Sequence, residues 1–335
     1  MCGIFAHLQD ATSLDTSAYK DRIAHRGPDE TVSLALCNVL MVFHRLMIND
    51  LSRDGMQPIR DGEKCAVMSN CEIYNHMQLR REYQLDISSS CDASVMMPLI
   101  QSVGVKNACA LFDGVFALVY VNGKDVYAAR DPVGVRSMYE GRHKGSIILA
   151  SEMKSIPPDF HVRPFPPGTV VHYRQDDDQN WQHVNSIVFK TNYNAPMSPI
   201  TYNSAANTIY ALLEQAVHKR MMSDRPIGCL LSGGLDSSII AALAAAYMRK
   251  SNKRLSTFAI GLKGSPDLNF ARIAAGHLDT DHHEVILTED QLLAEVQDTI
   301  YQIESYDVTT IRASVPLRLL CKYISSKTDI KVLLS

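Results

Sequence analysis

The sequence predicts two domains of different fold class, an α+β domain with antiparallel sheets followed by an α/β domain with a parallel sheet. The chain of 335 residues is long enough for two separate cores. Short apolar runs separated by turn residues fill its first half, whereas apolar strands alternate with longer helical segments in its second half. Between the two patterns the composition becomes polar and loses its periodicity.

In the first half, the short apolar runs are typical of strands that pair in antiparallel sheets. They read GIFAHL, TVSLALCNVLMVFHRLMI, GVFALVYV, DVYAA and SIILAS. Helices are expected near Asp15 to Ala24 and Val95 to Gly104. From about Asp176 to Pro199, DDDQN is followed by Asn, Pro and Ser residues without periodicity, which predicts a surface turn and then a linker. We place the linker at residues 186–204, between domains at 2–185 and 205–335.

The second half predicts a parallel sheet because strands and helices alternate along it. The expected strands are Ile227–Leu231, Leu255–Ile260, Glu284–Leu287 and Ile330–Leu334. The expected helices are Ser237–Arg249, Asn269–Leu278, Glu289–Glu304 and Ala313–Ser325. Ligands of such sheets bind at the carboxyl ends of the strands, so we expect a binding site there.

The composition argues against several classes of function. A net charge of −3 without clustered cations gives no electrostatic footprint for nucleic acid or an anionic membrane. No apolar run approaches the roughly 20 residues that span a bilayer. The eight cysteines include no CxxC pair and no regular spacing, unlike a disulfide framework or a zinc site. We therefore expect a reduced, cytoplasmic protein.

The segment LLSGGLDSS, at Leu230–Ser238, joins a predicted strand to a predicted helix and has the chemistry of a phosphate site. Gly233 and Gly234 can adopt positive φ and turn backbone N–H groups toward an anion, and the serines add hydroxyl donors at the helix N-terminus. Asp236 would repel phosphate unless a cation lay between them, which implies a divalent ion such as Mg²⁺. The simpler interpretation is a serine-capped helix after a Gly-Gly turn.

Cys2 is the second chemically informative residue. Removal of Met1 ahead of this small residue would expose a cysteine with a free α-amine. A thiol of pKa about 8.5 beside an amine of pKa about 7.7 to 8.0 places a nucleophile and a base within one residue. Taken alone, a cysteine at position two is more often simply an early residue.

Several motifs, taken in chain order, resemble the class II glutamine amidotransferases. They are CGIFA at the start, AHRGPDE at Ala24–Glu30, HRLMIND at His44–Asp50, GMQP at Gly55–Pro58, NCEIYNH at Asn70–His76 and RDPVG at Arg130–Gly134. LLSGGLDSS resembles the pyrophosphate loop of the ATP pyrophosphatases. With AIGLKGSPDL at Ala259–Leu268 and YDVTTIRAS at Tyr306–Ser314, the resemblance extends to the glutamine-hydrolysing asparagine synthetases and covers nearly all of the chain. It implies an N-terminal-nucleophile αββα sandwich followed by an ATP-pyrophosphatase-type parallel-sheet domain.

The resemblance implies a role for each residue of a glutaminase site. Cys2 would attack the side-chain amide of glutamine with its own α-amine as proton acceptor, while the Asn70 side chain and the Cys71 backbone N–H form the oxyanion hole. Arg45 would pair with the substrate α-carboxylate, and Asp92 with its α-ammonium group. The remainder of the glutamine pocket would be formed by Leu46, Met47, Ile48, Asn49 and Glu72.

In the second domain, the resemblance implies that ATP activates the β-carboxylate of aspartate and that ammonia from the first site displaces AMP. The implied ATP-binding residues are Leu230, Ser232, Gly233, Gly234, Asp236, Ser237, Ile260 and Ser335. Asp236 would hold Mg²⁺ together with ATP. The YDVTTIRAS segment would add polar groups for phosphate or aspartate; without the resemblance it is an ordinary polar loop. The family also implies a homodimer.

Two departures from the family pattern leave alternatives open. Cys71 stands where the family has glycine; if that position has positive φ, a β-carbon costs about 1 to 2 kcal/mol and is expected to slow glutamine hydrolysis. The chain ends at Ser335, the first residue of a further family motif, so we expect an incomplete second domain with an exposed last strand. The alternatives are a glutaminase with a silent synthetase half, and a binding or regulatory partner of an intact synthetase.

Overall fold

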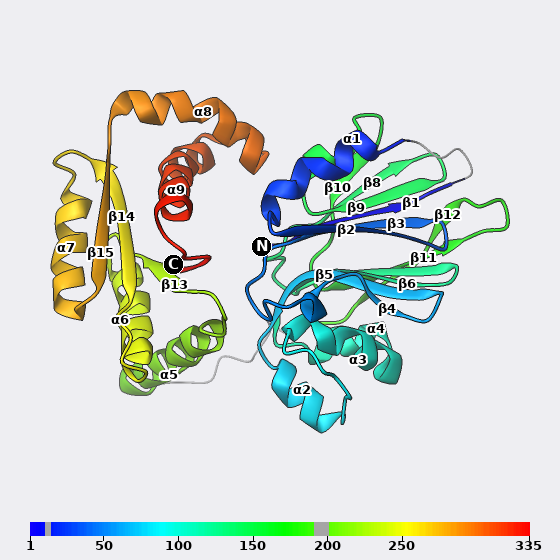
Figure 1. The fold of residues 1–335 in the computed structure, drawn as a ribbon, viewed down its shortest axis with the longest axis horizontal. Coiled ribbons are helices and arrows are strands. Elements are labelled where there is room, and N and C mark those ends of the chain that lie inside the picture. Colours follow the sequence, from blue (N-terminus) through cyan, green and yellow to red (C-terminus); the bar gives the residue numbers. More distant parts are fainter. Residues whose placement is uncertain (11–14, 191–200) are drawn as a thin grey trace. The chain divides into compact units, whose positions relative to one another are not determined.

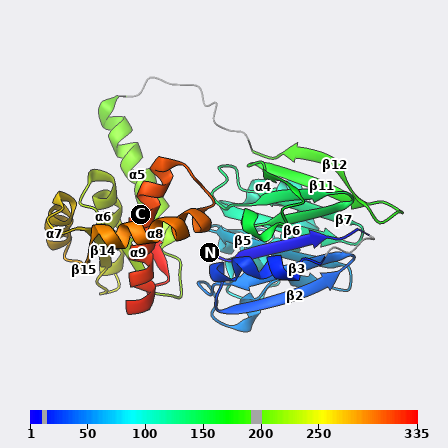
Figure 2. The same cartoon turned by 90° about the horizontal axis from the view of Figure 1, so that it is seen from above.

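Two compact units make up the chain, Met1–Pro196 and Met197–Ser335, each with its own hydrophobic core (Figures 1 and 2). The structure, a computed structural model, describes residues 1–10, 15–190 and 201–335. Most of the predicted linker, residues 191–200, therefore lies outside the described residues.

The first unit contains two stacked antiparallel sheets of six strands each. The first sheet has the order β10 (His161–Pro164), β8 (Tyr139–His143), β9 (Ser146–Ala150), β1 (Gly3–Leu8), β3 (Val39–Arg45) and β2 (Glu30–Leu36). The second has the order β12 (Trp181–Val188), β11 (Thr169–Gln175), β7 (Asp125–Arg130), β6 (Gly114–Asn122), β5 (Cys65–Ile73) and β4 (Ile59–Asp61). Apolar residues such as Ile4 of β1, Met68 of β5 and Val119 of β6 belong to the main core, which both sheets share.

Helices cover the outer faces of both sheets and complete the αββα sandwich, which confirms the predicted fold (Figure 1). α2 (His76–Glu82), α3 (Met96–Val103) and α4 (Val105–Leu111) pack on the second sheet. The first sheet is covered by the 3₁₀ helix η1 (Asp21–Arg26), which follows α1 (Ser17–Lys20) and buries Ile23, and by residues around η4 (Met153–Ser155).

The polar stretch after Asp176 contains a strand that sequence analysis missed. β12 pairs antiparallel with β11 at the edge of the second sheet. All of its residues except Trp181 are exposed, so the strand lacks the apolar alternation that reveals a half-buried strand. The predicted surface turn lies just before it, where Asp176 N donates to Asn180 O over 2.9 Å.

The second unit is built on a four-stranded parallel sheet, as predicted. The strand order is β15 (Asp281–Leu287), β14 (Ser256–Leu262), β13 (Ile227–Leu230) and β16 (Val332–Leu334). α6 (Leu235–Arg249) and α7 (Pro266–Leu278) pack on one face, and α5 (Tyr202–Arg220) packs against α6. α9 (Val308–Lys327) packs on the opposite face, with α8 (Glu289–Ile303) beside it. β16 is an edge strand of this sheet.

One helix of the second unit was not predicted, and another begins earlier than predicted. α5 begins at Tyr202, within the predicted linker, and was missed because Val217 is its one buried residue. α9 begins at Val308, and Asp307 caps it by accepting a hydrogen bond from Thr310 N over 2.8 Å. The YDVTTIRAS segment is therefore mostly the first turns of a helix rather than a polar loop. Within the described parts of both units, no helix is long and apolar enough to cross a membrane.

Candidate active sites

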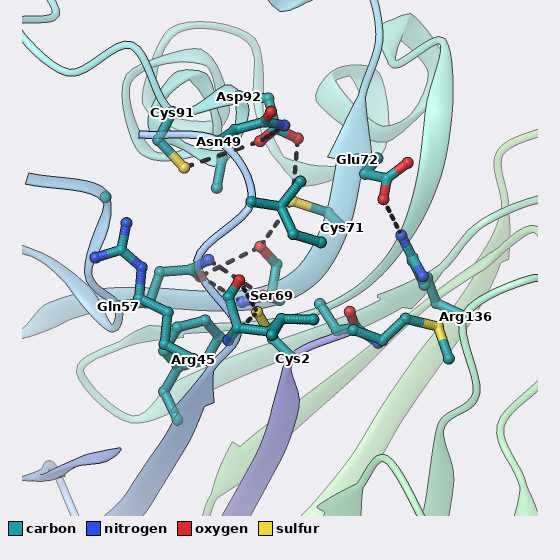
Figure 3. A pocket seen from close by; sticks show the side chains of 17 residues that line it. Cys2, Arg45, Asn49, Gln57, Ser69, Cys71, Glu72, Cys91, Asp92 and Arg136 are labelled. Atoms are coloured by element: carbon teal, nitrogen blue, oxygen red, sulfur yellow. Dashed lines mark hydrogen bonds and ion pairs between the residues drawn. The ribbon is translucent and has the colours of Figure 1, made fainter. Parts of the chain in front are cut away.

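A cavity of about 40 Å³ in the first unit brings together nearly all of the residues predicted to bind glutamine (Figure 3). The cavity is lined by the predicted nucleophile Cys2 and by eight of the predicted glutamine-binding residues: Arg45, Leu46, Ile48, Asn49, Asn70, Cys71, Glu72 and Asp92. Met47 does not line it. Cys2 directly precedes β1, and Arg45 ends β3; both strands belong to the first sheet. Asn70, Cys71 and Glu72 lie in β5 of the second sheet. The two sheets therefore each contribute one wall.

Cys2 is held by the backbone that follows β3. Its Sγ donates to Leu46 O over 3.7 Å, and Leu46 N lies 3.4 Å from the same sulfur. Burial raises the pKa of the Cys2 thiol, and burial lowers the pKa of the adjacent Met1 amine to about 6. At neutral pH the amine is therefore mainly an unprotonated base, while the thiol needs a base before it can act as a nucleophile.

Asn70 presents an unused hydrogen-bond donor to the cavity. The residue is 1% exposed, and its Nδ2 has no hydrogen-bond partner among the described residues. The neighbouring Ser69 is clamped by Gln57, whose Oε1 accepts from Ser69 N over 2.6 Å and whose Nε2 donates to Ser69 O over 3.2 Å. A buried N–H group without a partner is energetically costly, and an anionic oxygen in the cavity would remove that cost.

Cys71 adopts regular strand conformation, so the backbone strain expected for it is absent. It lies in β5 opposite Phe116 of β6 and is not among the described residues with positive φ. The expectation that a β-carbon here slows catalysis through an unfavourable φ is therefore wrong. The Cys71 thiol instead lies 3.3 Å from Ser69 Oγ and 3.9 Å from Asp92 Oδ2, and burial raises its pKa.

Asp92 is the buried acid of the cavity. It begins the 3₁₀ helix η3 (Asp92–Val95) and accepts hydrogen bonds from Ile73 N over 2.7 Å and Asn49 Nδ2 over 3.3 Å. The thiols of Cys71 and Cys91 lie 3.9 and 3.8 Å from its two oxygens (Figure 3). Burial raises the pKa of Asp92, so this carboxylate takes up a proton at a higher pH than an exposed aspartate does.

Arg45 is fixed by a loop that returns under its guanidinium group. Its Nη1 donates to Ser52 O over 2.6 Å, and its Nη2 donates to Asp50 O. Gly55 ends the short 3₁₀ helix η2 (Arg53–Gly55), and a β-carbon there would lie 2.2 Å from Arg45 Nη2. Glycine at this position therefore makes room for the guanidinium group. The remaining N–H groups of Arg45 are suited to a carboxylate.

Sequence analysis assigned no role to several other lining residues: Met1, Phe43, Gly55, Gln57, Ser69, Cys91, Ala93 and Arg136. Two of them could have been noticed, because Gln57 lies in the GMQP motif and Arg136 lies two residues after RDPVG. Their contacts depend on long-range folding, since Gln57 reaches Ser69 and Arg136 reaches Glu72.

In the second unit, LLSGGLDSS forms a tight turn between β13 and α6. Gly233 has φ +79°, and a β-carbon on it would lie 2.3 Å from the backbone carbon of Phe270. Ser232 Oγ and Ser237 Oγ lie 2.9 Å apart, and Gly234 N donates to Ser232 Oγ over 3.4 Å. This turn leaves Asp236 exposed in the first turn of α6.

The other predicted ATP-binding residues lie at or near the carboxyl ends of the strands of the parallel sheet. Leu230 ends β13 and pairs with Phe258 of β14, and Ile260 lies two residues further along β14. Ser335 follows β16, which pairs with β13 on its other side. In the described ranges no three His, Cys, Asp or Glu side chains are grouped to hold a metal ion. Asp236 alone fits Mg²⁺ that arrives with phosphates, because this ion commonly takes one or two carboxylates together with substrate phosphates.

Comparisons with known proteins give matches to both units. A glutamine amidotransferase domain model matches residues 1–181, and an asparagine synthase model matches residues 208–335. The asparagine synthetase [glutamine-hydrolyzing] of Bos taurus is 34% identical over 369 residues, and that of Gallus gallus is 36% identical over 369 residues. Each alignment covers 100% of this chain and 65% of the relative, so the chain spans somewhat less than two thirds of their length. A solved glutamine phosphoribosylpyrophosphate amidotransferase from B. subtilis gives a TM-score of 0.48 at 16% identity, over 100% of this chain and 91% of that one.

Proposed function

The chain belongs to the glutamine-hydrolysing asparagine synthetase family, with a glutamine amidotransferase domain ahead of an asparagine synthase domain, and from this premise we propose that it makes asparagine. Aspartate, glutamine and ATP would yield asparagine, glutamate, AMP and pyrophosphate. The observation that carries the proposal is the cavity that combines the partly buried Cys2 thiol, the chain N-terminus beside it and the unpartnered Asn70 amide.

Glutamine hydrolysis would begin once Met1 is removed and the α-amine belongs to Cys2. The amine takes the thiol proton while Sγ attacks the side-chain carbonyl carbon of glutamine, and Asn70 Nδ2 and the Cys71 N–H stabilise the oxyanion. The C–N bond then breaks, the nitrogen takes the proton from the α-ammonium group, and ammonia leaves a thioester on Cys2. Water hydrolyses the thioester to glutamate and restores the thiol. Met1 lines the cavity, so its removal would also enlarge the space for the substrate.

Aspartate activation would take place at the carboxyl end of the parallel sheet. The turn at Gly233 and Gly234 suits the phosphates of ATP, and adenine and ribose would lie near Leu230 and Ile260. Asp236 would hold Mg²⁺ with the nucleotide, and the ion would supply positive charge between the carboxylate and the phosphates. Ammonia from the first unit would displace AMP from the activated aspartate.

Three assays on the full chain test the proposal. They measure glutamate release from glutamine, pyrophosphate release dependent on ATP and aspartate, and asparagine formation with either glutamine or added ammonia. We expect all three products. Glutamate without pyrophosphate would instead establish a glutaminase with a silent synthetase half. The absence of glutamate from a protein with a processed Cys2 would contradict the proposal and favour a regulatory or binding role.

Replacing Asn70 by alanine is expected to lower kcat for glutamine hydrolysis by about 10²- to 10³-fold, with little change in KM. The side chain would donate to an oxyanion that is absent from bound glutamine and develops in the transition state. A loss of kcat of this size is typical when one such donor is removed. Steady-state kinetics of glutamate release measure this. Asn107, exposed on α4, provides the matched Asn→Ala control. A rise in KM with unchanged kcat would assign Asn70 to ground-state binding instead.

Glutamine binding is expected to weaken as the pH falls, because Asp92 must be ionised to pair with the substrate α-ammonium group. Burial raises the pKa of Asp92. As the pH falls, KM should therefore begin to rise at a higher pH than it would if the residue were an exposed aspartate. Asp92→Asn should raise KM by about 10- to 100-fold and remove this pH dependence. KM measured against pH tests both expectations, with Asp86→Asn at an exposed position as control. An unchanged KM in Asp92→Asn would exclude Asp92 from the binding of glutamine.

A further inference from the structure

We propose that Arg136 is a positioning residue of the glutaminase site, and that the Arg136–Glu72 ion pair sets the charge around the N-terminal amine that acts as base. The inference rests on the proposed function. It assigns a role to an arginine that sequence analysis left without one, and it gives Glu72 a second role besides lining the glutamine pocket.

The ion pair is part of the cavity wall. Arg136 Nη2 lies 2.9 Å from Glu72 Oε1, and the side chains are 7% and 28% exposed. Both residues line the cavity together with Met1 and Cys2, and Figure 3 shows the Glu72 carboxylate directed at Arg136. Because the pair is largely shielded from solvent, salt screens its field less than that of a surface pair.

The loop before β8 fixes Arg136 without using its side chain. The Asp131 carboxylate accepts hydrogen bonds from five backbone N–H groups, at 2.7 to 3.3 Å, those of Phe116, Val133, Gly134, Val135 and Arg136. Arg130 donates to the carbonyl oxygens of Gly134 over 2.6 Å, Arg136 over 2.7 Å and Phe165 over 2.9 Å. A substitution of the Arg136 side chain therefore leaves the contacts that shape this loop in place.

Arg136 and Glu72 act on the N-terminal amine with opposite signs. The N-terminal amine of the described chain is that of Met1, and burial is the largest cause of its lowered pKa. Cys2 and Glu72 raise this pKa, whereas Arg136 and Arg26 lower it further. Arg26 is already paired with Glu152, at 2.7 Å, and its Nε donates to Cys2 O over 3.1 Å. The other ionisable groups of the cavity are Cys2, Arg45, Cys71, Cys91 and Asp92. After removal of Met1 the amine lies one residue further along the chain, on Cys2 itself.

Because Arg136 and Glu72 line the same cavity as Cys2, the charge of Arg136 should favour the neutral, proton-accepting form of the Cys2 amine, and the charge of Glu72 should favour its protonated form. A positioning role of this kind predicts opposite consequences for the two partners. Loss of the cation should raise the pKa of the base, and loss of the anion should lower it. A purely structural ion pair would instead give two variants that lose activity together at every pH.

The test is the pH profile of kcat/KM for glutamate release by the full chain with Met1 removed, since the acidic limb of this profile reports the base of the free enzyme. We expect Arg136→Met to move the limb to higher pH and Glu72→Gln to move it to lower pH, each by on the order of one unit. The double variant should return toward the wild-type position, and Arg136→Lys should stay close to it. Lys124→Met, which removes a cation from an exposed pair with Asp177, is the matched control and should leave the limb in place.

A second readout titrates the amine itself and does not depend on turnover. The rate at which acetic anhydride acylates the N-terminal amine, measured against pH by mass spectrometry of the N-terminal peptide, should show the same opposite shifts. Unmoved titrations, or shifts in the same direction for both single variants, would overturn the inference. A wild-type protein that releases no glutamate would count against the proposed function, while the acylation titration would still decide the role of Arg136.

Discussion

Replacing Cys2 by alanine is expected to abolish glutamate release from glutamine, with kcat falling by about 10³-fold or more. The variant lacks the atom that would form the thioester, whereas the unpartnered Asn70 amide and the buried Asp92 carboxylate remain in place. The loss should therefore appear in kcat and leave the binding of glutamine largely intact. Glutamate release by stopped-time assay, with glutamine binding measured by calorimetry, separates the two effects.

The matched control is Cys321→Ser, because Cys321 is an exposed free thiol of the second unit. Its glutamate release should equal that of the wild-type protein. Pyrophosphate release in the presence of added ammonia, ATP and aspartate should be the same in Cys2→Ala and wild type, since ammonia bypasses the first site. Cys2→Ala that keeps more than a tenth of the wild-type glutaminase rate would place the nucleophile elsewhere.

Replacing Gly233 by alanine should both destabilise the second unit and remove ATP-dependent pyrophosphate release. The positive φ costs about 1 to 2 kcal/mol for a residue with a β-carbon. The new β-carbon would also lie 2.3 Å from the backbone carbon of Phe270. Such overpacking lowers the stability by about 1 to 3 kcal/mol more. The backbone must move to relieve the contact, which displaces the N–H groups that would face the phosphates. Urea unfolding and a pyrophosphate assay measure the two losses.

Gly264→Ala separates the two causes. Gly264 has φ +82°, close to that of Gly233, but a β-carbon there would meet no atom within 4 Å. Its variant should lose only the conformational part of the stability, about 1 to 2 kcal/mol, and keep pyrophosphate release. If both variants lose the same stability and the same activity, then close packing against α7 is not the reason for glycine at position 233.

The sequence predicted the candidate site residues more completely than it predicted the edge strand β12 and the backbone conformation of Cys71. The parallel sheet was predictable because its central strands, β13 and β14, are largely buried apolar runs that alternate with helices, with β13 and α6 as the clearest case. β12 was not, because an edge strand with almost all of its residues exposed shows no apolar alternation. The φ of Cys71 depends on how β5 pairs with β6, which the replacement of glycine by cysteine does not reveal.

The candidate glutaminase site shows the same division. Residues proposed to act through their own chemistry, such as Cys2 and Asn70, stand in recognisable motifs. Gln57 and Arg136 contact residues 12 and 64 positions away in sequence, Ser69 and Glu72, and these contacts become visible only once the chain is folded. Contacts of this kind follow from strand order and register, which a single sequence does not specify.

The division of the cavity between two sheets has a consequence for the inter-sheet core. The proposed nucleophile is carried by one sheet and the proposed oxyanion donor by the other, so side chains such as Ile4, Met68 and Val119 act as the spacer that sets their separation. A core that is thinned by one large-to-small substitution lets the sheets relax toward each other only partially. The distance between the proposed nucleophile and the proposed oxyanion donor would change while the fold persists. The rate of glutamate release should therefore respond to such a core substitution more strongly than the unfolding temperature does.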